Sequence, residues 1–280
     1  MKLKKQAKKG YIHGFDPKEQ RRLIHQASYL ESHVMPGIDF DSRGSGRLKI
    51  LEVGCGVGAQ SKILLRLFPQ ISIDAVDLSE AQLATAGRYL RRELKEKRVE
   101  LIHSDATELV SNLSRRRYDG AFLCWFLEHV PDPEKVLRQV HRLLKPGAKV
   151  YTTEVTNQTF FVFPQSPKLM EVWRKFNDQQ LELSGDPFVG MKVAGLLRAV
   201  GFRKIHSEVR ELHFDRRDRR KLKVFCNYFE RLVLSGVPSL ISSGRLKRSD
   251  VRALRSEFNV LRRDPSAVMF LGFVRAQAVR

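Results

Sequence analysis

The residues best placed to do chemistry lie in a segment that reads Ile-Leu-Glu-Val-Gly-Cys-Gly-Val-Gly, residues 50–58. A hydrophobic strand turns there into a helix through Gly54, Gly56 and Gly58. The missing side chains allow a tight turn and a close approach of a ligand to backbone N–H groups. With the alanine that follows, the loop also fits the GxGxxA pattern, and Asp77 stands at the distance of a ribose-binding acid. A nicotinamide-dependent dehydrogenase is therefore one hypothesis.

Three carboxylates help to choose between ligands. Glu52 lies two residues before the first glycine, at the mouth of the strand. A carboxylate there suits ammonium and sulfonium groups better than a pyrophosphate. Asp77 ends the second strand, where it can accept hydrogen bonds from both hydroxyls of a ribose. Asp105, in His-Ser-Asp-Ala-Thr after the third strand, is placed to meet an adenine amino group.

Short β-branched runs alternate with amphipathic segments between residues 47 and 155. This rhythm predicts a parallel sheet built from right-handed βαβ units. A capping box at Ser79-Glu-Ala-Gln82 begins one helix, and Asp132-Pro133-Glu134 begins another. The predicted strands are 48–53, 71–76, 98–103, 118–124 and 148–155, and the predicted helices are 60–68, 79 to about 97, and 133–144.

After residue 155 the alternation ends, and larger helices are predicted at 167–183, 189–200, 216–236 and 249–263, with strands at 202–212 and 268–279. We therefore divide the chain into an N-terminal lid segment (1–45), a core (46–156), a helical insertion (157–200) and a C-terminal part (201–280). That last part completes the sheet and carries a basic helical insertion at about 215–264.

Four motifs resemble those of class I S-adenosylmethionine-dependent methyltransferases, and they occur in the same order. They are LEVGCGVG (51–58), AVDLS (75–79), HSDAT (103–107) and FLEHVPDPEKVLRQVHRLLKPGAKV (126–150), the last being similar to the quinone-biosynthesis type. The resemblance implies an α/β, Rossmann-like fold with a seven-stranded sheet and helices on both faces. Its last strand is antiparallel, a role that residues 268–279 fit, and its helical insertions form a lid over the substrate.

The resemblance also implies S-adenosyl-L-methionine as cofactor and S-adenosyl-L-homocysteine as product. The three glycines would face the methionine part, with Glu52 nearby. Asp77 would bind the ribose hydroxyls beside Leu78, and Asp105 with Ala106 would hold the adenine.

Other site residues follow from the same resemblance. Cys124 and Trp125 would lie beside the sulfonium, although Cys124 also fits a small packed residue. The start Tyr11-Ile-His-Gly-Phe looks like a subgroup of small-molecule methyltransferases, and Tyr11 would close over the cofactor. His129, just past the fourth strand, is the candidate catalytic base, because a near-neutral pKa suits that task; His13 is another.

The predicted activity is methyl transfer to a small, apolar or anionic molecule by in-line displacement. A net charge of +20, from 51 Lys and Arg against 31 Asp and Glu, keeps an RNA methyltransferase open as an alternative. Against base methylation, Leu-Cys-Trp-Phe stands where an Asn/Asp-Pro-Pro-aromatic motif would follow the fourth strand. A non-catalytic module that binds the cofactor is the other alternative.

Composition limits the remaining possibilities. No apolar run approaches the roughly 20 residues of a membrane span, so we expect a cytoplasmic protein. Three scattered cysteines predict neither a disulfide framework nor a metal site. The basic start of the 216–236 helix could lie on an anionic membrane. Large side chains in the insertions predict a substrate lid: Met170, Trp173, Phe176, Phe225, Tyr228, Phe229 and Leu232.

Overall fold

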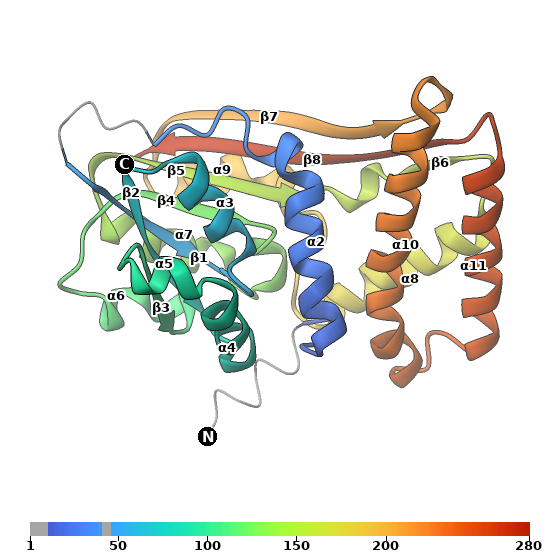
Figure 1. The fold of residues 1–280 in the computed structure, drawn as a ribbon, viewed down its shortest axis with the longest axis horizontal. Coiled ribbons are helices and arrows are strands. Elements are labelled where there is room, and N and C mark those ends of the chain that lie inside the picture. The colour runs from blue at the N-terminus through green and yellow to red at the C-terminus, as the bar shows by residue number, and fades with distance from the viewer. Residues whose placement is uncertain (1–10, 41–45) are drawn as a thin grey trace.

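The computed structural model of the chain describes residues 11–40 and 46–280, and the expectations for residues 1–10 and 41–45 lie outside them. Those ranges contain one eight-stranded sheet, with strand order β3-β2-β1-β4-β5-β8-β6 (Figure 1). Both β5 and β6 pair with one edge of β8, and β7 pairs with its other edge. Strands β1 to β5 are parallel, and β8 is antiparallel to β5, as predicted. The strands are β1 (Leu48–Val53), β2 (Ile71–Asp77), β3 (Val99–His103), β4 (Tyr118–Cys124), β5 (Leu144–Val155), β6 (Phe161–Phe163), β7 (Arg203–Phe214) and β8 (Val268–Val279).

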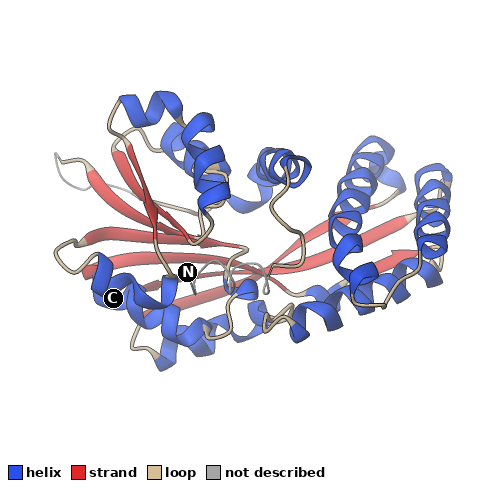
Figure 2. Cartoon of the chain, turned by 90° about the horizontal axis from the view of Figure 1, so that it is seen from below, coloured by secondary structure: helices blue, strands red, loops and turns tan. Residues whose placement is uncertain are grey.

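Helices cover both faces of this sheet (Figure 2). Capping side chains begin several of them: Asp16 accepts two amides at the start of α2, and Asp132 with Pro133 begins α7 as predicted. The α-helices are α2 (Pro17–Val34), α3 (Ala59–Leu67), α4 (Glu80–Tyr89), α5 (Arg91–Lys95), α6 (Leu109–Asn112), α7 (Pro133–Leu143), α8 (Pro167–Glu182), α9 (Val193–Ala199), α10 (Arg219–Ser242) and α11 (Arg248–Arg263). The 3₁₀ turns are η1 (Ala106–Glu108), η2 (Leu127–His129), η3 (Asn157–Thr159), η4 (Val189–Lys192) and η5 (Arg216–Asp218).

Several elements differ from the predicted ones. The helix predicted from Ser79 to about residue 97 is interrupted at Leu90, whose buried side chain packs against Gly58. The 216–236 helix is preceded by η5 and continues to residue 242. Strand β5 begins at residue 144, four residues earlier than predicted. The sheet gains β6, whose three residues are too few to show a periodicity in the sequence.

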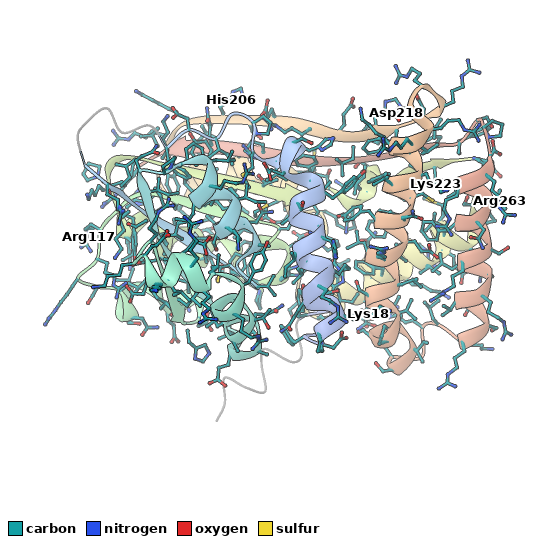
Figure 3. The ribbon with its side chains drawn as sticks, in the orientation of Figure 1. Lys18, Arg117, His206, Asp218, Lys223 and Arg263 are labelled. Atoms are coloured by element: carbon teal, nitrogen blue, oxygen red, sulfur yellow. The ribbon has the colours of Figure 1, made fainter. Side chains whose placement is uncertain are left out.

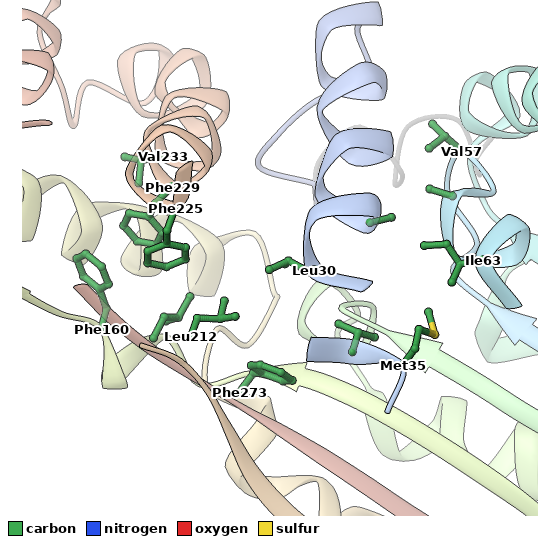
Figure 4. Close-up of a cluster of buried hydrophobic side chains, with 14 of the residues drawn as sticks. Leu30, Met35, Val57, Ile63, Phe160, Leu212, Phe225, Phe229, Val233 and Phe273 are labelled. Atoms are coloured by element: carbon green, nitrogen blue, oxygen red, sulfur yellow. The ribbon is translucent and has the colours of Figure 1, made fainter. Parts of the chain in front are cut away.

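One hydrophobic cluster joins the sheet to the helices beyond it (Figure 4). It runs from Ile63 of α3 through Leu30 of α2 to Phe229 of α10, and Phe273 of β8 belongs to it. A second cluster fills the opposite face of the sheet, under α7 and α9. The first cluster is continuous across α2, so α2 is a packed part of the fold.

The far halves of β7 and β8 extend past β5 and, with β6, carry α8, α10 and α11; we call this part the accessory layer (Figure 1). Helix α2 lies between it and the parallel strands. The buried guanidinium of Arg275, on β8, donates to the carbonyl oxygen of Val34 and to Thr153 Oγ1 at 2.8 Å. Arg210, on β7, donates to the His33 carbonyl oxygen at 3.0 Å. These donors hold the last turn of α2 on the sheet.

Over the described ranges, no helix combines the length and apolar character needed to cross a membrane.

Candidate active site

A cavity of about 730 Å³ lies at the carboxyl ends of β1, β2 and β4 and extends toward the accessory layer. The sheet order reverses between β1 and β4, which is where open α/β sheets bind their ligands. One half of the cavity is formed by the glycine loop (residues 54–58) and the turns after β2, β3 and β4. The other half is formed by α2, α8, α10, β7 and β8.

The three glycines of the loop have different reasons to be glycine, although all have positive φ values, of 76°, 53° and 74° in chain order. A Cβ atom on Gly54 would lie 2.1 Å from the Phe126 ring, and one on Gly58 would lie 2.5 Å from Leu90 Cδ1. A Cβ atom on Gly56 would meet no atom within 4 Å. Only Gly54 and Gly56 line the cavity, and the open space beside Gly56 is room for a ligand.

The backbone amides of this loop already have acceptors within the protein. The amides of Gly54 and Cys55 donate to the Val76 carbonyl oxygen, at 2.8 and 3.0 Å, and Gly58 donates to that of Cys55 at 2.9 Å. The Gly56 amide donates to Asp77 Oδ2 at 2.8 Å. The close approach of a ligand to free N–H groups, which the sequence suggested, therefore does not hold for these four amides.

Asp77 and Asp105 line the cavity with part of their accepting capacity unused. Asp77 Oδ1 accepts from the Ser79 amide at 2.8 Å, so each of its oxygens holds one amide and keeps a further lone pair. Burial raises the pKa of Asp77, and its bonds to backbone amides oppose that shift. Asp105 Oδ1 accepts from the Thr107 amide at 2.8 Å.

Two glutamines in the cavity wall were not predicted as site residues from the sequence. Gln60 Oε1 and Gln82 Oε1 are buried and accept no hydrogen bond from any residue that the structure describes. Gln60 lies in the first turn of α3 and Gln82 in the first turn of α4, directly after the glycine loop and after Asp77. Their position in these first helical turns is the feature of the sequence from which they could have been predicted.

The predicted cofactor residues divide into two groups in the structure. Glu52, Gly58 and Ala106 do not line the cavity. The Glu52 side chain is buried behind the glycine loop, where its Oε2 accepts from Ser61 Oγ at 2.5 Å, and burial raises its pKa to about 8. The structure brings the others together in the wall of the cavity: Tyr11, Gly54, Gly56, Asp77, Leu78, Asp105, Cys124, Trp125 and the candidate base His129.

The residues after β4 have an unusual backbone. Trp125 has a φ of 49°, rare for a non-glycine residue, and its amide donates to the Thr153 carbonyl oxygen at 2.7 Å. Its ring contacts Phe273 at a centroid distance of 6.3 Å. Burial raises the pKa of the Cys124 thiol well above its usual value. Cys124 is thus a neutral thiol in the wall, which disfavours a role as nucleophile.

Residues 11–15 close one side of the cavity. The Tyr11 ring lies 4.9 Å from the His129 ring and stacks on Phe15 at 5.1 Å. His13 Nδ1 lies 2.6 Å from Ser235 Oγ on α10. Burial lowers the pKa values of His13 and His129, so both are neutral near pH 7. The N-terminal segment therefore connects the accessory layer to the turn that carries His129.

His129 is a neutral imidazole with one nitrogen free. Its Nδ1 is buried and has no partner among the described residues, while its Nε2 lies 3.7 Å from Glu128 Oε1. Gln180, on α8, donates to Glu128 Oε2 at 2.8 Å. Glu154 Oε1 accepts from the Leu127 amide at 3.0 Å and so fixes the start of η2. Gln180 thus holds the Glu128 carboxylate, and Glu154 holds the turn that carries His129.

Most of the second half of the cavity is apolar. Of the predicted lid residues, Trp173, Phe176, Tyr228 and Leu232 line the cavity; Phe225 and Phe229 are fully buried in the core, and Met170 is exposed. Arg22, on α2, is the cationic group of this half, and Glu19 pairs with it at 2.6 Å. The apolar lining residues are Leu23, Ala27, Leu30, Trp173, Phe176, Leu212, Tyr228, Leu232, Leu271 and Phe273.

Comparisons with known proteins agree with this geometry. Residues 51–150 match the family described as methyltransferase domain. The ubiquinone biosynthesis O-methyltransferase of Azotobacter vinelandii is 32% identical over 131 residues, which are 46% of this chain and 50% of that protein. The chain therefore spans about half the length of the curated relatives it matches.

Two solved structures are similar over most of the chain. The cyclase SpnF has a TM-score of 0.52 at 17% identity, covering 92% of this chain and 81% of its own. The geranyl diphosphate C-methyltransferase of Streptomyces coelicolor A3(2), solved with S-adenosyl-L-homocysteine, has a TM-score of 0.50 at 16% identity, covering 91% and 76%. These likenesses establish the fold.

Proposed function

We propose that this chain, whose residues 51–150 match the methyltransferase domain family, transfers a methyl group from S-adenosylmethionine to a hydroxyl group of an apolar small molecule. The observation that carries the proposal is the cavity at the switch point. It combines acceptors suited to a nucleoside with an unpaired neutral imidazole and an apolar second half.

The residues of the first half fit S-adenosylmethionine. Asp77 would bind the ribose hydroxyls, Asp105 the adenine amino group, and the free oxygens of Gln60 and Gln82 would accept from the ligand's remaining donors. When bound, this cofactor supplies a methyl group activated by its positive sulfur. A dinucleotide fits less well, because the amides of Gly54, Cys55, Gly56 and Gly58 are already bonded within the protein and are not free for a pyrophosphate.

His129 is proposed as the base. As the bond from the methyl carbon to the sulfur breaks and the bond to the acceptor oxygen forms, the hydroxyl proton of the acceptor would pass to Nδ1 of His129, and S-adenosylhomocysteine would be left as the product. This imidazole is neutral, and its Nδ1 has no partner among the described residues. The nearby Glu128 carboxylate favours the imidazolium that results, and Gln180 keeps Glu128 in place. Residues 11–15 exclude water and, with the walls of the cavity, align the acceptor.

The apolar half indicates the kind of acceptor. Aromatic and aliphatic side chains from five elements, α2, α8, α10, β7 and β8, surround it, so binding follows from burial of apolar surface. The polar groups of the cavity, among them His129 and Glu128 from the turn after β4 and Arg22 from α2, would place the reactive end of the acceptor. We therefore propose a hydroxylated molecule with an apolar body.

Calorimetry and label transfer test the proposal. S-adenosylmethionine and its product should bind and NAD should not, and Asp77→Ala should weaken cofactor binding by about 1–3 kcal/mol. His129→Asn should lower kcat by about 100-fold or more with little change in KM, and should remove the ionisation of the base from the pH profile. Tight NAD binding without S-adenosylmethionine binding would overturn the assignment.

The same assay separates the two alternatives. Methyl-labelled cofactor is supplied with fractions of a metabolite extract or with purified RNA at physiological salt. Label in an apolar fraction supports the proposal. Label in RNA would instead support the alternative of an RNA methyltransferase, which the net charge favours. Cofactor binding with no transfer to either would identify a regulatory module.

A further inference from the structure

The outer face of the accessory layer presents exposed aromatic side chains. Along β6, Phe161 and Phe163 are 55% and 46% exposed, whereas Val162 between them is buried in the core under α8 and α10. Alternate residues of a strand point to opposite faces. The two phenylalanines therefore lie on the sheet face turned away from these helices. Phe161 pairs with Phe270 on β8, so this face carries a group of aromatic rings.

A run of basic residues follows β7 at the same end of the layer. Within residues 215–223, Arg217 pairs with Asp215 at 2.8 Å and Lys221 with Asp218 at 3.2 Å. Four further cations of this run are exposed and have no ion-pair partner among the described residues: Arg216, Arg219, Arg220 and Lys223. Figure 3 labels Asp218, Lys223 and Arg263 at this same end of the molecule. The charge here is thus largely uncompensated.

Strand register brings the aromatic and basic groups together. Phe214, the last residue of β7, pairs with Met269 of β8, and Val162 of β6 pairs with the same residue from the other side. The ends of β6 and β7 are therefore two strand spacings apart, roughly 10 Å. Figure 1 shows the connection from β7 to α10 rising beyond the ribbon of β7 and β8. We call Phe161, Phe163, Arg216, Arg219 and Arg220 the distal surface.

We propose that the distal surface docks on an anionic lipid bilayer, with the two phenyl rings at the headgroup boundary and the arginines against lipid phosphates. A surface that combines exposed aromatic rings with several free cations meets both requirements of a peripheral contact. A second copy of the chain fits less well, since a two-fold axis would bring the same arginines face to face. This inference does not depend on the proposed methyl transfer.

Vesicle co-sedimentation tests it, with vesicles of phosphatidylcholine alone or mixed with phosphatidylglycerol. The protein should sediment with the mixed vesicles only. Replacing both Phe161 and Phe163 by Ser should reduce the bound fraction several-fold. Reversing Arg216, Arg219 and Arg220 to Glu should reduce it by about tenfold or more, because each cation near an anionic surface contributes to binding.

A matched control separates the surface from the overall charge. Arg91, Arg115 and Arg142 are exposed in the parallel part of the fold, and reversing these three changes the net charge by the same amount. This control should keep most of its vesicle binding, and equal losses in both triple variants would overturn the proposal.

Two further readouts complete the test. All variants should bind S-adenosylmethionine as the parent does, since Phe273 and the cavity lie on the side of β8 opposite to the distal surface. A failure of cofactor binding is therefore distinguished from a loss of vesicle binding. If the parent ignores anionic vesicles but retains single-stranded RNA through Phe161 and Phe163, the surface is a nucleic-acid platform and the membrane proposal is wrong.

Discussion

Alanine substitutions at two glycines of one loop should separate cofactor binding from stability. Gly56 and Gly58 both have left-handed backbones, and alanine in that conformation costs about 1–2 kcal/mol. At Gly58 the new Cβ would lie 2.5 Å from Leu90 Cδ1 and 3.3 Å from Ala86 Cβ. Leu90 is fully buried and cannot move freely. Overpacking should then add about 1–3 kcal/mol at Gly58.

At Gly56 the new methyl group would enter open space in the cavity instead. The free energy of unfolding should therefore fall by only about 1–2 kcal/mol. S-adenosylmethionine should bind at least tenfold more weakly, a loss of about 1.4 kcal/mol, because the methyl group occupies its space. Gly58→Ala should show the reverse pattern, with the larger loss of stability and nearly parental affinity in the folded protein.

Denaturant unfolding and calorimetry measure the two quantities on the same preparations. Each cofactor affinity is measured at a denaturant concentration well below the midpoint of unfolding, so that nearly all of the protein is folded. Parental cofactor affinity in Gly56→Ala would refute the reasoning, because the open space at Gly56 would then not be cofactor space. Weak binding in both variants would show that the whole loop must keep its shape.

Three further expectations follow from the structure. Burial raises the pKa of Glu52 from 4.5 to about 8, so the ligand-free protein should lose stability as the pH rises through this interval, and Glu52→Gln should flatten that slope in denaturant unfolding. Deleting residues 1–15 should weaken cofactor binding in calorimetry and cut turnover while unfolding stays cooperative, whereas deleting residues 1–9 should do little. Arg275→Met should cost about 1–3 kcal/mol and speed hydrogen exchange in α2, because the Val34 carbonyl oxygen loses its donor.

Local patterns were sufficient to predict the parallel half of the fold. Strands β1 and β4 have the predicted limits, because each is a short apolar run bounded by residues that end a strand. The antiparallel strand β8 also has the predicted limits. The place of the cavity followed as well, since the carboxyl ends of parallel strands meet at one edge and the glycines mark the turn there.

What the sequence did not predict depends on contacts between distant residues. The pattern from Ser79 to residue 97 is continuous, and only the packing of Leu90 against Gly58 shows why the helix is interrupted. The free oxygens of Gln60 and Gln82 are equally invisible, because an unpaired acceptor is defined by the absence of neighbours that the fold determines. The same holds for Arg275, whose partners are up to 241 positions away.

Strand β8 has a consequence for how such a protein can diversify. Strands β5 and β6 occupy one edge of β8 in tandem, Val155 opposite Phe273 and Phe161 opposite Phe270, while β7 runs along the other edge. The segments 164–202 and 215–267 both leave this four-strand frame and return to it. We expect that either segment can be lengthened, shortened or exchanged while β5 stays paired with β8, because neither segment includes residues of that pairing. A lineage could therefore acquire a new acceptor by recombining these segments while the half proposed to hold the nucleoside stays unchanged, and chimaeras built at the same boundaries offer a laboratory route to the same end.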